Sequence, residues 1–250
     1  MKKMRSGFTF IEVSLFLAIT GLVFVGIAVG TQNSIFWQRY NDSVQSFAEF
    51  LRSEYSRVAN VQLNATVENK GRIALGRVIL FDKNGSINSY LLSVGEKAEN
   101  ASGGIKDWLK NDSASPEIDK NVGISEKFIP RWGAQIQTTA SYNDNGSYEP
   151  YTGAIMIVRH PSNGTIYTFV NSEVKDEDAL KLSFATDEEV DGYESAQVDF
   201  CVNPNGADKS NLRRDVRIIK DARNASGVEV VTDSVINNDS GENEGNRCAE

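Results

Sequence analysis

The chain has 250 residues, and its 34 acidic residues outnumber 26 lysines and arginines to give a formal net charge of −8. This length allows one or two domains. The acidic balance argues against broad affinity for nucleic acid, which needs a concentrated basic surface. It fits a surface on which like charge keeps separate molecules apart in solution.

The N-terminal region joins a short basic leader to a long apolar run. Three basic residues precede Gly7, and the run over 8–30 contains one ionisable side chain, Glu12. About 20 apolar residues in a helix span the roughly 30 Å hydrocarbon layer of a bilayer. The basic leader favours a cytoplasmic N-terminus. We therefore expect a single-pass helix in the cytoplasmic membrane, with the chain after residue 30 outside.

Glu12 is the residue that most needs an explanation. A carboxylate inside a membrane-length segment costs about 2.5–3.5 kcal/mol on insertion scales. We therefore expect it to find a cationic partner within a packed assembly. A plain signal anchor with an accidental Glu12 is the alternative. An ordinary secretory signal differs, because its apolar region is shorter and its small-residue cleavage site follows that region, whereas Gly7 precedes it here.

The basic leader, the Gly7–Phe8 junction, Thr9, Glu12 and the uninterrupted apolar run together resemble the class III signal of type IV pilins and type II secretion pseudopilins. The resemblance covers about a fifth of the chain. It implies cleavage after Gly7 by a prepilin peptidase and methylation of the new amino group of Phe8. It further implies that the carboxylate of Glu12 neutralises this amine as subunits enter a filament. Many family members carry a proline where this chain has Val29.

The same resemblance implies the pilin fold, in which a long N-terminal helix packs against an antiparallel sheet. It implies a surface filament as the destination, and other pilin subunits, the prepilin peptidase and the inner-membrane assembly platform as partners. A pseudopilin of a secretion or DNA-uptake apparatus shares this N-terminal chemistry, and a membrane-anchored binding module that never polymerises is a further alternative. Late in the chain, a short motif formed by Phe200, Pro204 and Gly206 faintly resembles the closing strands of GspH/FimT-type minor pilins.

The region after the apolar run is amphipathic. We predict one helix over 8–60, of which 8–30 lies in the membrane or filament core and 31–60 packs under a sheet. A break at 30–33 would instead give two helices. Gly21, Gly26 and Gly30 fit either local unwinding or small-residue helix packing. The apolar stripe of the second half consists of Val44, Phe47, Leu51, Tyr55 and Val58.

Residues 61–250 predict a β-rich globular domain. Short apolar runs alternate with turns, and hairpin signals occur at the Asn-Gly pair 84–85 and at 160–164. The polar region 98–122 indicates an inserted loop with a possible short helix at 105–110. A helix followed by antiparallel strands is an α+β fold. The expected strands are 77–81, 87–92, 134–140, 153–159, 165–171, 180–184, 196–202, 215–220 and 228–232.

The chain has two cysteines, Cys201 and Cys248, and both lie in the part predicted to be exported. Two thiols in an oxidising compartment most simply pair with each other. The bond would tie the polar tail 237–250 to the domain and constrain the unfolded chain by about 4 kcal/mol. Two free thiols in a poorly oxidising compartment are the alternative.

One cluster of basic residues lies at 209–223. Some FimT-like minor pilins bind DNA through C-terminal arginines, so this similarity makes Arg213, Arg214 and Arg217 possible DNA contacts. No aromatic residue interleaves with them to stack on bases, and acidic residues lie beside them. We therefore expect a solvated strand face without a nucleic-acid partner.

The sequence shows no arrangement of catalytic residues. The single His160 lies in a turn-like segment, no cysteine pair has the spacing of metal ligands, and there is no phosphate loop or cofactor fingerprint. We expect a protein that is not an enzyme and that has no cofactor and no metal site.

Overall fold

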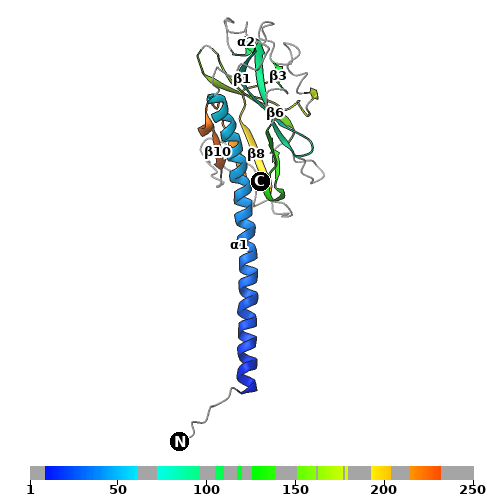
Figure 1. Ribbon diagram of the computed structural model, residues 1–250, viewed down its shortest axis with the longest axis vertical. Helices are drawn as coiled ribbons and strands as arrows, with labels where there is room; N and C mark the ends of the chain where they lie inside the picture. Colours follow the sequence, from blue (N-terminus) through cyan, green and yellow to red (C-terminus); the bar gives the residue numbers. More distant parts are fainter. Residues whose placement is uncertain are drawn as a thin grey trace, which may run out of the picture. The chain divides into compact units, whose positions relative to one another are not determined.

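The structure is a computed structural model that describes residues 9–60, 72–95, 105–109, 117–119, 126–138, 151–161, 163–176, 178–179, 193–203 and 214–231. The chain forms two compact units, 1–41 and 42–250. Helix α1 (Phe10–Ala59) belongs to both, since it passes through the boundary without interruption (Figure 1). The prediction of one continuous helix is therefore confirmed, and the alternative of two helices with a break at 30–33 is wrong.

Two antiparallel sheets make up the β-structure of the described residues, which confirms the α+β class. The larger has the order β3-β2-β1-β6-β7, with β4 also paired to β2, and the smaller has the order β10-β9-β8-β5. The larger sheet consists of β1 (Arg72–Phe81), β2 (Ile87–Gly95), β3 (Glu117–Asp119), β4 (Glu126–Phe128), β6 (Gly153–Arg159) and β7 (Ile166–Asn171). The smaller consists of β5 (Gln135–Thr138), β8 (Val198–Asn203), β9 (Arg214–Ile218) and β10 (Val228–Val231). The short helical elements are α2 (Ile105–Leu109), η2 (Arg131–Gly133) and η5 (Ala225–Gly227).

The predicted strands within the described residues are present, but β1 begins at Arg72, five residues before the predicted start at 77, and the other ends shift by up to three residues. The hairpin of β1 and β2 closes as expected, because Gly85 takes a φ of +73° and donates its N–H to the carbonyl of Asp82 at 2.8 Å. The predicted strand 180–184 lies outside the described residues. Strands β3 and β4 were not predicted, since they are three-residue polar segments whose pairing with β2 is set by tertiary contacts.

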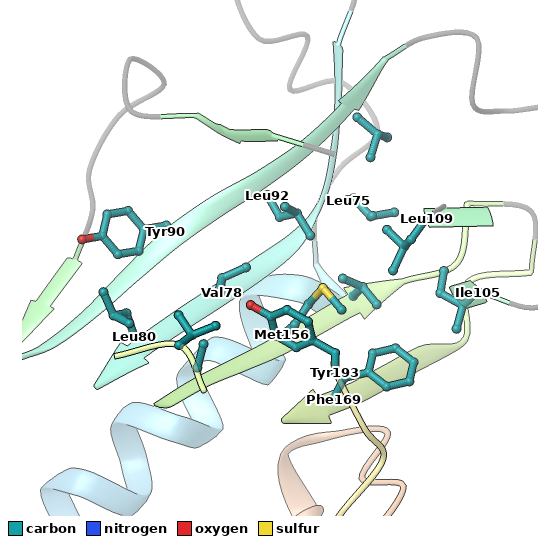
Figure 2. Packing of buried hydrophobic residues seen from close by; sticks show 14 residues of the cluster. Leu75, Val78, Leu80, Tyr90, Leu92, Ile105, Leu109, Met156, Phe169 and Tyr193 are labelled. Atoms are coloured by element: carbon teal, nitrogen blue, oxygen red, sulfur yellow. The ribbon is translucent and has the colours of Figure 1, made fainter. Parts of the chain in front are cut away.

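The larger sheet is buried on both faces, which explains why its central strands are apolar without alternation. In β6 the run from Gly153 to Val158 is buried throughout. Figure 2 shows one face, where Val78, Leu92 and Met156 pack with Leu109 of α2. The opposite face carries Phe81, which contacts α1.

Within the second unit, α1 packs against both sheets through aromatic side chains. Phe47 of α1 meets Phe81 of β1 with ring centroids 6.4 Å apart and Phe200 of β8 at 5.5 Å. The rings of Phe81 and Phe200 stack on each other with their centroids 5.1 Å apart. All five residues of the predicted stripe are buried, which confirms the amphipathic prediction for this half of the helix. They are Val44, Phe47, Leu51, Tyr55 and Val58.

Polar groups at this junction are paired inside the core. The hydroxyl groups of Tyr55 and Thr168 are 2.8 Å apart, and Thr168 donates to the carbonyl of Ala222 at 2.8 Å. Burial raises the pKa of Tyr55 to about 12, so the phenol stays neutral and can continue to donate. This chain of hydrogen bonds joins α1 to β7 and to the turn after β9.

Gly76 gives a prediction about the pairing of β1 with β6. A Cβ atom at this position would lie 2.1 Å from the carbonyl oxygen of Ile157, so the backbones would have to separate. We expect Gly76→Ala to lower the free energy of unfolding by about 2–3 kcal/mol, measured by urea denaturation. Gly21→Ala is the control, because nothing lies within 4 Å of its added Cβ. An equal effect of both substitutions would contradict the prediction.

Candidate functional site

The predicted processing site lies outside the described residues, which begin at Thr9. Cleavage after Gly7 and methylation of Phe8 therefore stay predictions. The described part of the site begins one residue later and includes Glu12, the acid on which the assembly hypothesis depends.

Thr9 and Glu12 form a reciprocal cap at the start of α1. The backbone N–H of Thr9 donates to Oε2 of Glu12 at 2.9 Å, and the hydroxyl donates to the same oxygen at 3.0 Å. The backbone N–H of Glu12 in turn donates to the Thr9 hydroxyl at 3.3 Å. This is a capping box, which satisfies donors at the helix start that have no intrahelical acceptor. Sequence reasoning missed it, although the pattern Thr-x-x-Glu at 9–12 is its signature.

The cap leaves some hydrogen-bond acceptor sites of the Glu12 carboxylate unused. Both hydrogen bonds from Thr9 use Oε2, while an ionised carboxylate offers about four lone-pair sites on two oxygens. Oε1 can therefore accept from an additional donor without loss of the cap. Chemically, the site can hold a cation while the first turn of the helix stays intact.

The helix around this acid has the properties of a membrane span. An 18-residue window of α1 is strongly apolar and none of it is buried inside the protein, which fits a transmembrane helix by length and composition. Large apolar side chains are exposed from Phe10 to Val29. The hydroxyls of Ser14, Thr20 and Thr31 donate to carbonyls four residues earlier, at 2.7–3.0 Å. They thereby satisfy themselves without water, as a lipid environment requires.

Gly21, Gly26 and Gly30 lie inside continuous helix. Nothing in the structure approaches within 4 Å of a Cβ added at any of them. The isolated chain therefore gives no packing reason for these glycines. Both interpretations of them, helix unwinding and packing against another helix, stay predictions.

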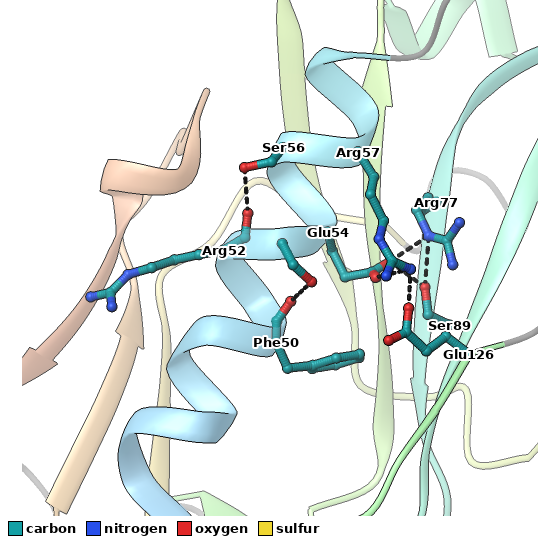
Figure 3. A network of polar contacts seen from close by, with 9 residues as sticks. Phe50, Arg52, Glu54, Ser56, Arg57, Arg77, Ser89 and Glu126 are labelled. Carbon is teal, nitrogen blue, oxygen red and sulfur yellow. Dashed lines mark hydrogen bonds and ion pairs between the residues drawn. The ribbon is translucent and has the colours of Figure 1, made fainter. Parts of the chain in front are cut away.

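A buried ionic network ties the end of α1 to the larger sheet. Figure 3 shows the carboxylate of Glu54 meeting Arg77 of β1 and Ser89 of β2, both of which donate to it. The side chain of Glu54 is fully buried and that of Arg77 is 11% exposed. Arg57 lies 3.3 Å from the second oxygen of Glu54 and also pairs with Glu126 of β4. The network positions the helix on the sheet.

The turn around η2 holds a strained aromatic residue beside α1. Trp132 has a φ of +58°, which is costly for a bulky side chain. Its indole N–H donates to Asp42 at 2.9 Å, and the Ser43 hydroxyl donates to the carbonyl of Arg131 at 2.7 Å. The Trp132 hydrogen bond, helped by the charge of Arg131, lowers the pKa of Asp42. These contacts stabilise the turn on the first residues of the second unit.

Within the basic cluster 209–223, Arg217 forms ion pairs inside the domain. Arg217 is 7% exposed and pairs with Asp199 and Asp215, the latter at 2.9 Å. Burial opposes its charge, but the hydrogen bond and charge of Asp199, together with Asp215, outweigh this and raise the pKa of Arg217. The guanidinium of Arg217 is therefore held within the sheet by two carboxylates, and its possible DNA contact stays a prediction. Arg214 is half-buried at the start of β9, and Arg213 lies outside the described residues.

Cys201 is buried on β8, at 3% exposure, and is not a free thiol. Its predicted partner Cys248 lies outside the described residues, so the pairing itself stays a prediction. Where the structure describes the chain, no three His, Cys, Asp or Glu side chains gather as a metal site would require.

Comparison with protein-family models, with curated proteins and with solved structures finds no match.

Proposed function

We propose that this protein is a type IV pilin-like subunit that is cleaved after Gly7 and polymerised through its N-terminal helix into a surface filament. The observation that carries the proposal is the placement of Glu12. It is the one acid near the start of an exposed apolar helix of membrane-spanning length, and such an acid is costly without a partner. The leader and the Gly7–Phe8 junction supply that partner, because cleavage there creates a new amine four residues away.

The capping box supports a two-stage use of the carboxylate. In the membrane-inserted monomer, Thr9 provides two donors to Glu12 and lowers the cost of its burial. On assembly, the amine of Phe8 from the same or a neighbouring subunit binds the remaining oxygen. Opposite charges attract strongly where the dielectric constant is low. The pairing would thereby fix the axial register of neighbouring helices.

The β-rich unit 42–250 is then the part displayed outside the membrane. The prepilin peptidase and the inner-membrane platform act on the N-terminal helix, and other subunits pack against its apolar surface. Because that surface is exposed along most of the span, it can exchange lipid for neighbouring helices when a subunit leaves the membrane.

Mass spectrometry of the protein from its native cells tests the first step. We expect the mature chain to begin at Phe8 with a methylated amine, and Gly7→Ile to retain the leader because a side chain there obstructs the cut. Val29→Ile is the matched control, since it adds one methylene inside the apolar run. A wild-type protein that keeps its first seven residues would refute the proposal.

Mechanical shearing of cells tests the second step. A filament subunit appears in the sheared fraction, whereas a membrane-anchored module that never polymerises stays with the cells. Deletion of the gene, scored for twitching, DNA uptake and protein secretion, then separates a pilus subunit from a pseudopilin. Imaging of purified filaments with an antibody to 42–250 shows whether the subunit lies along the shaft or at the tip.

A further inference from the structure

The sequence is rich in the tripeptide Asn-x-Ser/Thr, which is the acceptor motif for N-linked glycosylation. With 22 asparagines and 35 serines and threonines in 250 residues, about three such tripeptides are expected by chance. Nine occur, and they begin at Asn41, Asn64, Asn84, Asn100, Asn111, Asn145, Asn163, Asn224 and Asn238. Because the motif alone does not make an acceptor, the local structure must distinguish among those that lie in the described residues.

The first of the four described tripeptides is unsuited to be an acceptor, because it lies inside a helix. Asn41 is part of α1, whereas acceptor motifs are used in surface loops. The hydroxyl of Ser43, at the third position of the motif, is buried and donates to the carbonyl of Arg131 at 2.7 Å. Binding of this hydroxyl by a transferase would require the turn beside α1 to open.

Two further tripeptides lie in turns, but their asparagine side chains are already engaged. The carboxamide oxygen of Asn163 accepts from the N–H of Thr165 at 2.9 Å. The carboxamide oxygen of Asn224 accepts from both the N–H and the hydroxyl of Ser226 and thereby caps η5. In each case the carboxamide is held by the residue that completes its own motif.

Asn84 lies at the tip of the hairpin that joins β1 to β2. Two backbone hydrogen bonds close this turn, from the N–H of Asp82 to the carbonyl of Ser86 at 2.9 Å and from the N–H of Gly85 to the carbonyl of Asp82 at 2.8 Å. The side chain of Asn84 is exposed. Neither β4 nor β6, the strands that flank the hairpin, pairs with residues 82–86. The tip therefore extends beyond the described strands of the sheet.

The polar groups of this fourth motif are available to an enzyme. Nδ2 of Asn84 makes one hydrogen bond, to the carboxylate of Asp82 at 3.4 Å, which is long and therefore weak. Among the described residues, neither Oδ1 of Asn84 nor the hydroxyl of Ser86 has a hydrogen-bond partner. A transferase can bind all three groups while the backbone of the turn stays closed.

We propose that Asn84 is the acceptor of an N-linked oligosaccharide, with Ser86 as the hydroxyl residue that a membrane oligosaccharyltransferase recognises. Nδ2 of Asn84 forms a bond to the anomeric carbon of a lipid-pyrophosphate-linked oligosaccharide. The lipid pyrophosphate leaves with the electron pair of the broken C–O bond, and a base of the transferase takes one proton from the amide. The proposal rests on the outward placement of 42–250 that the proposed function includes, and filament formation is not required for it.

The N-terminal anchor favours this transfer. Residue 84 follows the apolar run 8–30, so a cytoplasmic leader places it on the outer side of the membrane. The sugar donor is anchored in a bilayer by its lipid, and α1 has the length and composition to anchor the acceptor in the same bilayer. Confining two reactants to one surface raises their effective concentration.

Mass spectrometry of proteolytic peptides from the full chain, purified from its native cells, tests the proposal. We expect a glycopeptide whose sugar is attached at Asn84. Asn84→Gln and Ser86→Ala should each lower the glycosylated fraction of this peptide by more than about tenfold, whereas Ser86→Thr should preserve it because it keeps a hydroxyl. Lys83→Gln is the matched control, since Lys83 is exposed in the same turn and lies outside the essential positions of the motif.

Three results would overturn the proposal. They are recovery of the peptide only in unmodified form, conversion of Asn84 to aspartate without a sugar, and a sugar that persists in Ser86→Ala. Protease added outside an intact cytoplasmic membrane separates this proposal from the proposed function. Digestion of 42–250 together with an unmodified Asn84 refutes the glycosylation alone, whereas protection of 42–250 refutes the outward placement on which both depend.

Discussion

Glu12→Gln is expected to lower the amount of the protein in the sheared filament fraction more than tenfold. The variant should still be inserted in the membrane and cleaved. Glutamine is also a capping-box residue, so the hydrogen bonds from Thr9 can persist. The substitution removes the negative charge and leaves the cap. An ammonium group that enters the filament core would then lack its counter-ion, which costs several kcal/mol, and 1.4 kcal/mol already corresponds to a factor of ten.

Two companion variants distinguish charge from cap. Thr9→Ala keeps the charge and removes the hydroxyl that bonds to Glu12, so we expect incorporation to fall much less than in Glu12→Gln. Glu49→Gln is the matched control, because Glu49 is an exposed acid further along α1. Quantitative immunoblots of sheared and cell-bound fractions measure all three. Normal incorporation of Glu12→Gln or Glu12→Ala would refute the assembly role of the carboxylate.

The long helix and most strands could be predicted because their signals are local. The stripe from Val44 to Val58 repeats at helical spacing, and the segment 153–159 is an apolar run bounded by turns. The structure places β6 at those same residues. Periodicity reports which side chains must be buried, and it does so before any tertiary contact is known.

The polar interior could not be predicted in the same way. Glu54 lies off the apolar stripe of α1, yet it is fully buried. Arg217 was assigned to a solvated strand face, and it is buried between two aspartates. Spacing shows that these charges lie off the apolar stripe. The packing of α1 on β1 brings Glu54 to Arg77, and the pairing of β8 with β9 brings Asp199 to Arg217. Only these tertiary contacts place the opposite charges close enough to be buried together.

The environment of Glu12 could be predicted from the sequence only in part. Its cost in an apolar segment was evident from the sequence, and so was the need for a partner. The partner found in the monomer is Thr9, at a spacing that the sequence already displayed. A local cap and a cation satisfy different parts of the same carboxylate, because the cap supplies neutral donors and leaves the negative charge without a counter-ion.

Glu54→Leu is expected to lower the free energy of unfolding of the second unit by about 3–5 kcal/mol, because it leaves a buried guanidinium without its carboxylate. The side chain of Arg77 is 11% exposed, and one of its terminal nitrogens already makes no hydrogen bond. Arg57 is less affected, since it is 44% exposed and keeps Glu126. Urea denaturation followed by far-ultraviolet circular dichroism measures the loss. Glu49→Leu, on the exposed side of the same helix, should change it little.

The double variant Glu54→Leu/Arg77→Met gives the decisive comparison. A buried ion pair replaced by apolar side chains of similar volume is often neutral or stabilising, so the double variant should recover most of the stability lost in Glu54→Leu. Each single variant leaves one desolvated charge in the junction, and the pair together leaves none. Additive losses would show instead that the two side chains act independently. In that case Ser89, which also donates to Glu54, would have to account for the burial of the acid without Arg77.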